Sequence, residues 1–169
     1  MFLDESGFRL LPFLRRTWAL VGQTPVLKAP LRWSRLSVMG AITHQGQLFT
    51  WIQKKGFCKE HIRRFLQHLL HHIEGDILIV WDNLSAHKSH LVQDFIAGHD
   101  RLEGLHLPPY APDLNPVEWL WSYLKMTELA NCCCFDLVEL RCEIRKAFER
   151  VRHRPDLLLS FVHQLYDFV

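Results

Sequence analysis

The stretch Ile77-Leu78-Ile79-Val80-Trp81-Asp82 decides the fold of this chain. Five apolar residues follow one another without polar alternation, a pattern typical of a strand that is covered on both faces of a sheet. Residues 77–81 therefore predict a central strand, with Asp82 at its carboxyl end.

Four more strands are predicted around this one. Residues 36–43 and 48–53 are rich in β-branched and apolar residues, and His44-Gln45-Gly46-Gln47 between them predicts a hairpin. Residues 102–107 form another candidate strand. Residues 2–4 have the pattern of the end of a strand, so we expect part of this first strand to be missing.

Helices are predicted between and after the strands, from apolar residues at helical spacing and from capping residues at the helix starts. The predicted helices are residues 59–73, residues 85–97, and three that begin at Pro116 with Asn115 as the cap, after Asp136, and at Pro155. The order of elements predicts the α/β class, with a mixed sheet flanked by helices in a single domain over residues 1–169.

Composition limits the classes of protein to which this chain can belong. With 169 residues, 49% of them hydrophobic, the chain can bury one core. The formal charge of +2 identifies no partner. Five cysteines without regular spacing indicate a reducing compartment rather than a disulfide framework, and we find no signal peptide or membrane-spanning run. We therefore expect a cytoplasmic protein with no membrane partner.

Basic clusters and tryptophans have simpler explanations than ligand binding. Three basic clusters are typical of solvated faces, and phosphate contact is the less favoured interpretation for any one of them. The six tryptophans are expected mainly in the core, although Trp18 and Trp33 lie in a basic segment where they could contact DNA. The third basic cluster comprises Arg141, Arg145, Lys146, Arg150, Arg152 and Arg154.

Three acidic residues stand out by their placement: Asp4 in the first strand, Asp82 after the central strand, and Glu118 in the first turn of a helix. If the two strands are neighbours, these carboxylates meet at one edge of the sheet, where oxygen ligands suit Mg²⁺ or Mn²⁺. Capping explains the same positions, because Glu118 can complete a capping box with Asn115 and Asp82 can cap a turn. Spacing alone does not choose between the two.

Several motifs around these acids have a more specific pattern. They are Asp4-Glu5-Ser6-Gly7-Phe8, the later Trp18 and Gly22, Trp81-Asp82-Asn83 with His87, and Leu107-Pro108-Pro109-Tyr110-Ala111-Pro112-Asp113-Leu114-Asn115-Pro116-Val117-Glu118. Over residues 2–128 they resemble the catalytic core of mariner-like and related insertion-sequence DDE transposases. The proline-rich segment that ends in Asn-Pro-x-Glu is the most specific part of this resemblance.

The resemblance implies a ribonuclease-H-like fold with a mixed five-stranded sheet, and metal-dependent DNA cleavage and strand transfer in transposition. It implies that Asp4, Asp82 and Glu118 are catalytic and bind two Mg²⁺ or Mn²⁺ ions. Asn83 and His87 receive supporting roles, such as orienting ligands or contacting phosphate. Asn115 belongs with them, although capping is the simpler explanation for it. The implied partners are DNA, as transposon ends and target, and a second copy or a partner transposase subunit.

One departure from the family leaves an alternative open. Its members carry helix-turn-helix modules ahead of the catalytic domain, whereas three residues precede Asp4 here. We therefore expect the N-terminal helix-turn-helix region to be absent. The alternative function is an inactive transposase remnant that binds nucleic acid or a partner subunit, and an unrelated ribonuclease-H-like nuclease is a weaker third hypothesis.

Overall fold

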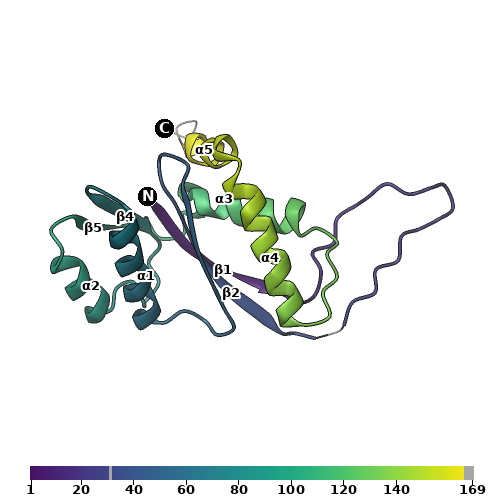
Figure 1. Ribbon diagram of the computed structural model, residues 1–169, viewed down its shortest axis with the longest axis horizontal. Helices are drawn as coiled ribbons and strands as arrows, with labels where there is room; N and C mark the ends of the chain where they lie inside the picture. The colour runs from purple at the N-terminus through teal and green to yellow at the C-terminus, as the bar shows by residue number, and fades with distance from the viewer. Residues whose placement is uncertain (31, 166–169) are drawn as a thin grey trace.

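The computed structural model describes residues 1–30 and 32–165, and it contains one mixed five-stranded sheet in the order β3-β2-β1-β4-β5 (Figure 1). β1 pairs antiparallel with β2 and parallel with β4. The five strands are β1 (Phe2–Arg9), β2 (Arg35–Ile42), β3 (Leu48–Gln53), β4 (Ile77–Trp81) and β5 (Leu102–His106). The predicted hairpin and the mixed α/β sheet are confirmed.

The first strand differs from its prediction. β1 runs through Arg9 and pairs with β2 along its full length, so Asp4 lies within the strand and not at its end. The polar residues Glu5 and Ser6 resemble a turn in the sequence, but the fold supplies each with a polar partner. β1 is also the central strand, and β4 lies beside it. Leu78 of β4 is 42% exposed whereas Val80 on the same face is buried, so the prediction that both faces of this strand are covered is met except at Leu78.

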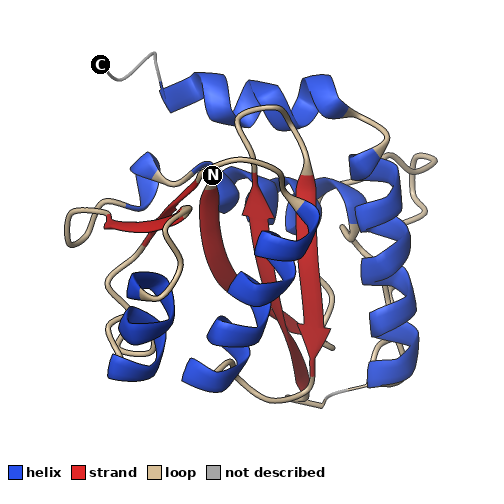
Figure 2. Cartoon of the chain, turned by 60° about the vertical axis from the view of Figure 1, so that its left-hand side comes forward, coloured by secondary structure: helices blue, strands red, loops and turns tan. Residues whose placement is uncertain are grey.

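Helices cover both faces of the sheet (Figure 2). Because side chains alternate along a strand, β1 contributes Leu3 to one buried cluster and Phe8 to the other. The first cluster includes residues of α1 (Lys59–His72) and α2 (His90–Ala97). The second includes residues of α3 (Pro116–Tyr123), α4 (Leu137–Arg152) and α5 (Pro155–His163).

Most predicted helix starts are confirmed. α3 begins at Pro116 and α5 at Pro155, while Asp136 caps α4 by accepting from two backbone N–H groups at 2.8 Å each. α2 begins at His90, later than expected, because the residues that follow Asp82 form turns. α3 continues into η2 (Leu124–Glu128), a short π-helical segment. No helix in the described part of the chain is long and apolar enough to cross a membrane.

A long connection between β1 and β2, described over residues 10–30 and 32–34, projects away from the sheet (Figure 1, right). We call it the arm. It is tied to the body where Phe13 bridges to Ala130 and where the backbone N–H of Arg15 donates to Asn131. Trp18 is 99% exposed and Trp33 is 80% exposed, so the expectation that the tryptophans lie in the core was wrong for these two.

Candidate active site

All three acids that the sequence analysis selected line one cavity of about 480 Å³. It opens where the ends of β4 and β5 face the start of α3. Five of the six predicted site residues line it, and the sixth, His87, is fully buried and contacts Asp82. The lining comprises Asp4, Asp82, Asn83, Leu84, Leu107, Pro108, Pro109, Tyr110, Ala111, Pro112, Asn115 and Glu118.

Asp4 is hydrogen-bonded by the indole ring of Trp121. The Nε1–H group of Trp121 donates to Asp4 Oδ2 at 2.6 Å, and Asp4 is only 7% exposed. Burial and, after it, the nearby charge of Glu118 together raise the pKa of Asp4 to about 7, and the bond from Trp121 acts against both. The ring lies over Gly40, where an added Cβ would meet Trp121 Cη2 at 2.6 Å. Glycine at this position therefore lets the ring reach Asp4.

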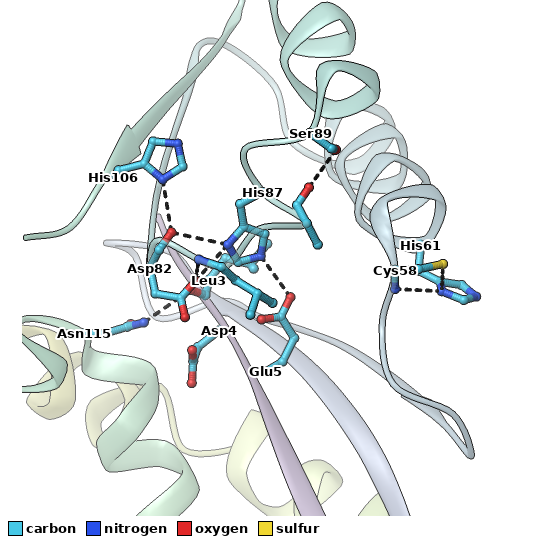
Figure 3. Close-up of polar contacts among 12 residues, drawn as sticks. Leu3, Asp4, Glu5, Cys58, His61, Asp82, His87, Ser89, His106 and Asn115 are labelled. Atoms are coloured by element: carbon cyan, nitrogen blue, oxygen red, sulfur yellow. Dashed lines mark hydrogen bonds and ion pairs between the residues drawn. The ribbon is translucent and has the colours of Figure 1, made fainter. Parts of the chain in front are cut away.

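Asp82 is paired with His87 (Figure 3). His87 lies 2.9 Å from Asp82 Oδ1 through Nδ1 and 3.1 Å from Glu5 Oε1 through Nε2, and its ring stacks on Trp81 at 4.5 Å between centroids. Burial lowers the pKa of His87, but the bonds with Asp82 and Glu5 outweigh this and raise it to about 9. Protonated His87 donates to both carboxylates, and its bond to Asp82 lowers the pKa of Asp82.

Asp82 also caps a turn, as the alternative interpretation expected. Its Oδ1 accepts from the backbone N–H of Leu84 at 2.9 Å. This role does not exclude a second one, because a carboxylate has two oxygens and several lone pairs.

Asn115 joins α3 to β1. Its side-chain oxygen caps the helix by accepting from Val117 N, and its Nδ2 donates to the carbonyl of Leu3, next to Asp4. The expected cap is confirmed. Because the backbone N–H of Asn115 donates to Pro112 O, Glu118 does not complete the capping box, and its exposed carboxylate faces the cavity.

Asn83 positions the proline-rich rim. Its Nδ2 donates to Leu107 O, while Leu107 N donates to Trp81 O, so the exit of β5 is tied to the end of β4. Tyr110 at the rim has a φ of 59° and is fully exposed. A non-glycine residue in this conformation is uncommon and stores strain.

Sequence reasoning missed the residues that support the acids. Trp121 lies one helical turn after Glu118, and this spacing could have identified it. Glu5 follows Asp4 but points to the opposite face, as alternation requires. Lys125 donates to Ser6 Oγ at 2.7 Å; burial lowers its pKa, while Glu118 and Asp4 act in the opposite direction.

The cavity fits a divalent cation in donor type and in charge. Its acids are oxygen donors of the kind that Mg²⁺ and Mn²⁺ prefer. The pKa of Asp4 is raised by burial and then by the charge of Glu118, and a bound cation would offset both effects. Among the described residues, however, no group of three or more His, Cys, Asp or Glu side chains is arranged to hold a metal ion. The bonds of Asp4 to Trp121 and of Asp82 to His87 compete with such an arrangement.

The sequence pattern of the DDE superfamily endonucleases matches residues 1–134. The chain belongs to this family. The chain is also similar to the "Insertion element IS630 uncharacterized 39 kDa protein" of Shigella sonnei, with 26% identity over 158 residues, which are 90% of this chain and 45% of that protein.

Solved structures show the same fold. The mariner Mos1 paired end complex with Mg matches with a TM-score of 0.73 at 17% identity, over 97% of this chain and 51% of that chain. The catalytic domain of Mos1 mariner transposase matches with a TM-score of 0.61 at 13% identity, over 98% of this chain and 80% of that chain. The ribonuclease-H-like expectation is confirmed. The chain spans about half the length of the IS630 protein and of the transposase chain in the paired end complex.

Proposed function

We propose that this chain is the catalytic domain of a DNA transposase, which cleaves DNA and transfers the freed strand end to a target. One observation carries the proposal: three acids from separate parts of the fold line one cavity in a chain of the DDE family. These acids are Asp4, Asp82 and Glu118. Two of the similar solved structures are a Mos1 transposase paired-end complex with the left transposon end and the Mos1 strand transfer complex. Transposon ends and target DNA are therefore the proposed substrates.

Asp4, Asp82 and Glu118 are the residues that would hold two Mg²⁺ or Mn²⁺ ions, and related complexes were crystallised with Mg and Mn. When bound, such ions activate the attacking oxygen and stabilise the leaving oxygen of a phosphodiester. The supporting residues act on the acids themselves. His87 keeps Asp82 ionised, Trp121 orients Asp4, and the bond from Asn115 to β1 sets the position of Glu118.

Residues 1–169 are proposed to form a single catalytic domain. The family match ends at residue 134, but α4 and α5 bury Phe148 and Phe161 in the same cluster as Phe8 of β1. The C-terminal helices thus complete one core of the sheet. We also propose an intracellular location, which the five free cysteines support.

A second copy of the chain, or a partner transposase subunit, is the proposed protein partner. The arm supports this proposal because it exposes Trp18, Val21 and Trp33 almost completely, and a group of exposed large apolar side chains is typical of an interaction surface. Sedimentation of the chain and of a Trp18→Ala, Trp33→Ala variant tests it. A wild-type chain that is monomeric at all concentrations, with and without DNA, would contradict it.

Metal-dependent cleavage of supercoiled plasmid DNA tests the proposed activity. Nicking is expected with Mg²⁺ or Mn²⁺, and Asp82→Asn and Glu118→Gln should abolish it while leaving folding intact. Asp100→Asn is the matched control, because it removes the same charge from an exposed turn residue outside the cavity.

Calorimetry of Mn²⁺ binding provides a second readout, in which the two cavity variants should lose heat of binding and the control should not. Equal nicking by wild type and Asp82→Asn would contradict the proposal that Asp82 holds a catalytic metal ion. DNA binding without any nicking would instead favour the inactive remnant.

A further inference from the structure

The outer edge of β3 offers backbone groups that none of the five described strands pairs. Thr43 N donates to Gln47 O at the hairpin end, so hydrogen-bonded and open pairs alternate from there along β2 and β3. This alternation directs the backbone N–H and C=O groups of Leu48, Thr50 and Ile52 away from β2. An edge of this kind normally accepts another strand.

Two arginines of α4 already occupy two of the three outward carbonyls of this edge. Arg141 Nη1 donates to Ile52 O at 2.9 Å, and Arg152 Nε donates to Leu48 O at 3.4 Å. Arg152 Nη2 also donates to Thr50 Oγ1 at 2.6 Å. With the carbonyls of Leu48 and Ile52 taken, the edge cannot complete the usual hydrogen-bond ladder with another strand. The N–H groups of Thr50 and Ile52 still point outward, so the edge is rich in donors.

A cavity of about 520 Å³ lies between β3 and α4, next to these donors. Arg145 is exposed and lines it, with Arg141 and Arg152 on either side along the helix. Glu149 is the one acid among the lining residues, and it pairs with Arg152 at 2.9 Å. Three guanidinium groups against one carboxylate leave a net positive charge, and in the described part of the chain no hydrogen bond or ion pair engages the Arg145 side chain. The lining comprises Thr50, Trp51, Ile52, Arg141, Arg145, Phe148, Glu149 and Arg152.

We propose that this cavity binds a phosphate group of a DNA backbone, outside the catalytic cavity. A phosphodiester accepts hydrogen bonds in several directions, which suits the guanidinium fork of Arg145 together with strand N–H groups. The proposal rests on the proposed function for its choice of DNA. It also gives part of the third basic cluster a role that the sequence did not favour, because the fold turns Arg141, Arg145 and Arg152 toward the donor-rich edge.

The phosphate site is separate from the acids. Thr50 pairs with Gly40, and Gly40 pairs with Asp4, so two strand spacings, roughly 10 Å, separate Thr50 from Asp4. Trp121 of α3 stands over Gly40 between them. Substitutions in the β3–α4 cavity therefore need not disturb the catalytic cavity, and a failure of the phosphate site can be told apart from a failure of the metal site.

Salt-dependent DNA binding tests the site with a matched pair of variants. Arg145→Ala removes a positive charge inside the cavity, and Lys146→Ala removes the same charge from the next residue of the same helix, outside the cavity. Anisotropy of a labelled 30-base-pair duplex is measured over a range of salt concentrations. Arg145→Ala should lower the slope of log K against log[salt] by about 0.9, the value for one phosphate contact, and Lys146→Ala should leave it unchanged.

Arg145→Lys keeps the charge and should keep most of the slope. Equal slopes for Arg145→Ala, Lys146→Ala and wild type would overturn the proposal, as would equal losses in the two alanine variants. Amide NMR signals of Thr50 and Ile52 add a local readout, since both should shift with the duplex. Shifts with inorganic phosphate alone, and none with the duplex, would overturn the choice of DNA. Mn²⁺ binding by Arg145→Ala should equal that of wild type, which separates this site from the proposed metal site.

Discussion

Gly40→Ala should disrupt the support of Asp4 without touching any acid. The new methyl group would lie 2.6 Å from Trp121 Cη2 and 3.1 Å from Cζ2, well inside normal carbon contact distance. The ring belongs to a fully buried cluster and has little room to withdraw. If it shifts, Trp121 loses its 2.6 Å bond to Asp4.

The expected cost combines two effects. Overpacking of a core costs about 1–3 kcal/mol, and loss of a hydrogen bond to a charged group costs about 1.5–3 kcal/mol. The two overlap because they share one ring movement, so we expect the free energy of unfolding to fall by about 2–4 kcal/mol.

Urea denaturation measures this loss, and the NMR signal of the Trp121 indole N–H reports the bond directly. Gly7→Ala is the matched control, since it lies in the neighbouring strand and its added Cβ would meet only Arg35 Cδ at 4.0 Å. This control should unfold like wild type or be more stable by up to about 1 kcal/mol. A Gly40→Ala protein as stable as the control, with an unmoved indole signal, would refute the reasoning.

Three further predictions concern caps and thiols. Asn115→Ala removes the α3 cap and a buried bond to Leu3 O, and should lower the free energy of unfolding by about 1–2 kcal/mol in urea denaturation; a cost near zero would contradict the link to β1. Asp136→Ala should cost about 1 kcal/mol in the same assay, whereas Asp136→Asn, an equally good cap, should cost little. Iodoacetamide at pH 8 should modify exposed Cys58 well before Cys134, because burial raises the pKa of Cys134 to about 12; mass spectrometry showing equal rates in the native protein would count against this.

Local patterns in the sequence predicted most of the secondary structure. The caps Asn115 and Asp136 and the prolines at 116 and 155 mark helix starts that depend only on adjacent residues, and all of these starts are confirmed. Failures occurred where tertiary contacts override local preference. Glu5 and Ser6 resemble a turn, yet they remain in β1 because His87 and Lys125 satisfy them from distant parts of the chain.

The candidate site divides in the same way. Asp4, Asp82 and Glu118 could be selected by residue type and motif, since these depend on composition and order along the chain. Their convergence was expected if the two strands were neighbours, but the side chains that contact them could not be read from the sequence. The bond from Trp121 joins residues 117 positions apart, and the contact of His87 with Glu5 spans 82 positions.

The sequence by itself determined which residue types are available for chemistry, where most helices begin, and the resemblance that pointed to this family. Only the tertiary structure decided that β1 is the central strand, that Gly40 makes room for the ring beneath Asp4, and that three arginines of α4 face the open edge of β3. The physical reason is that capping and periodicity act between near neighbours in the chain. Burial, charge coupling and close packing depend on which distant segments the sheet brings together.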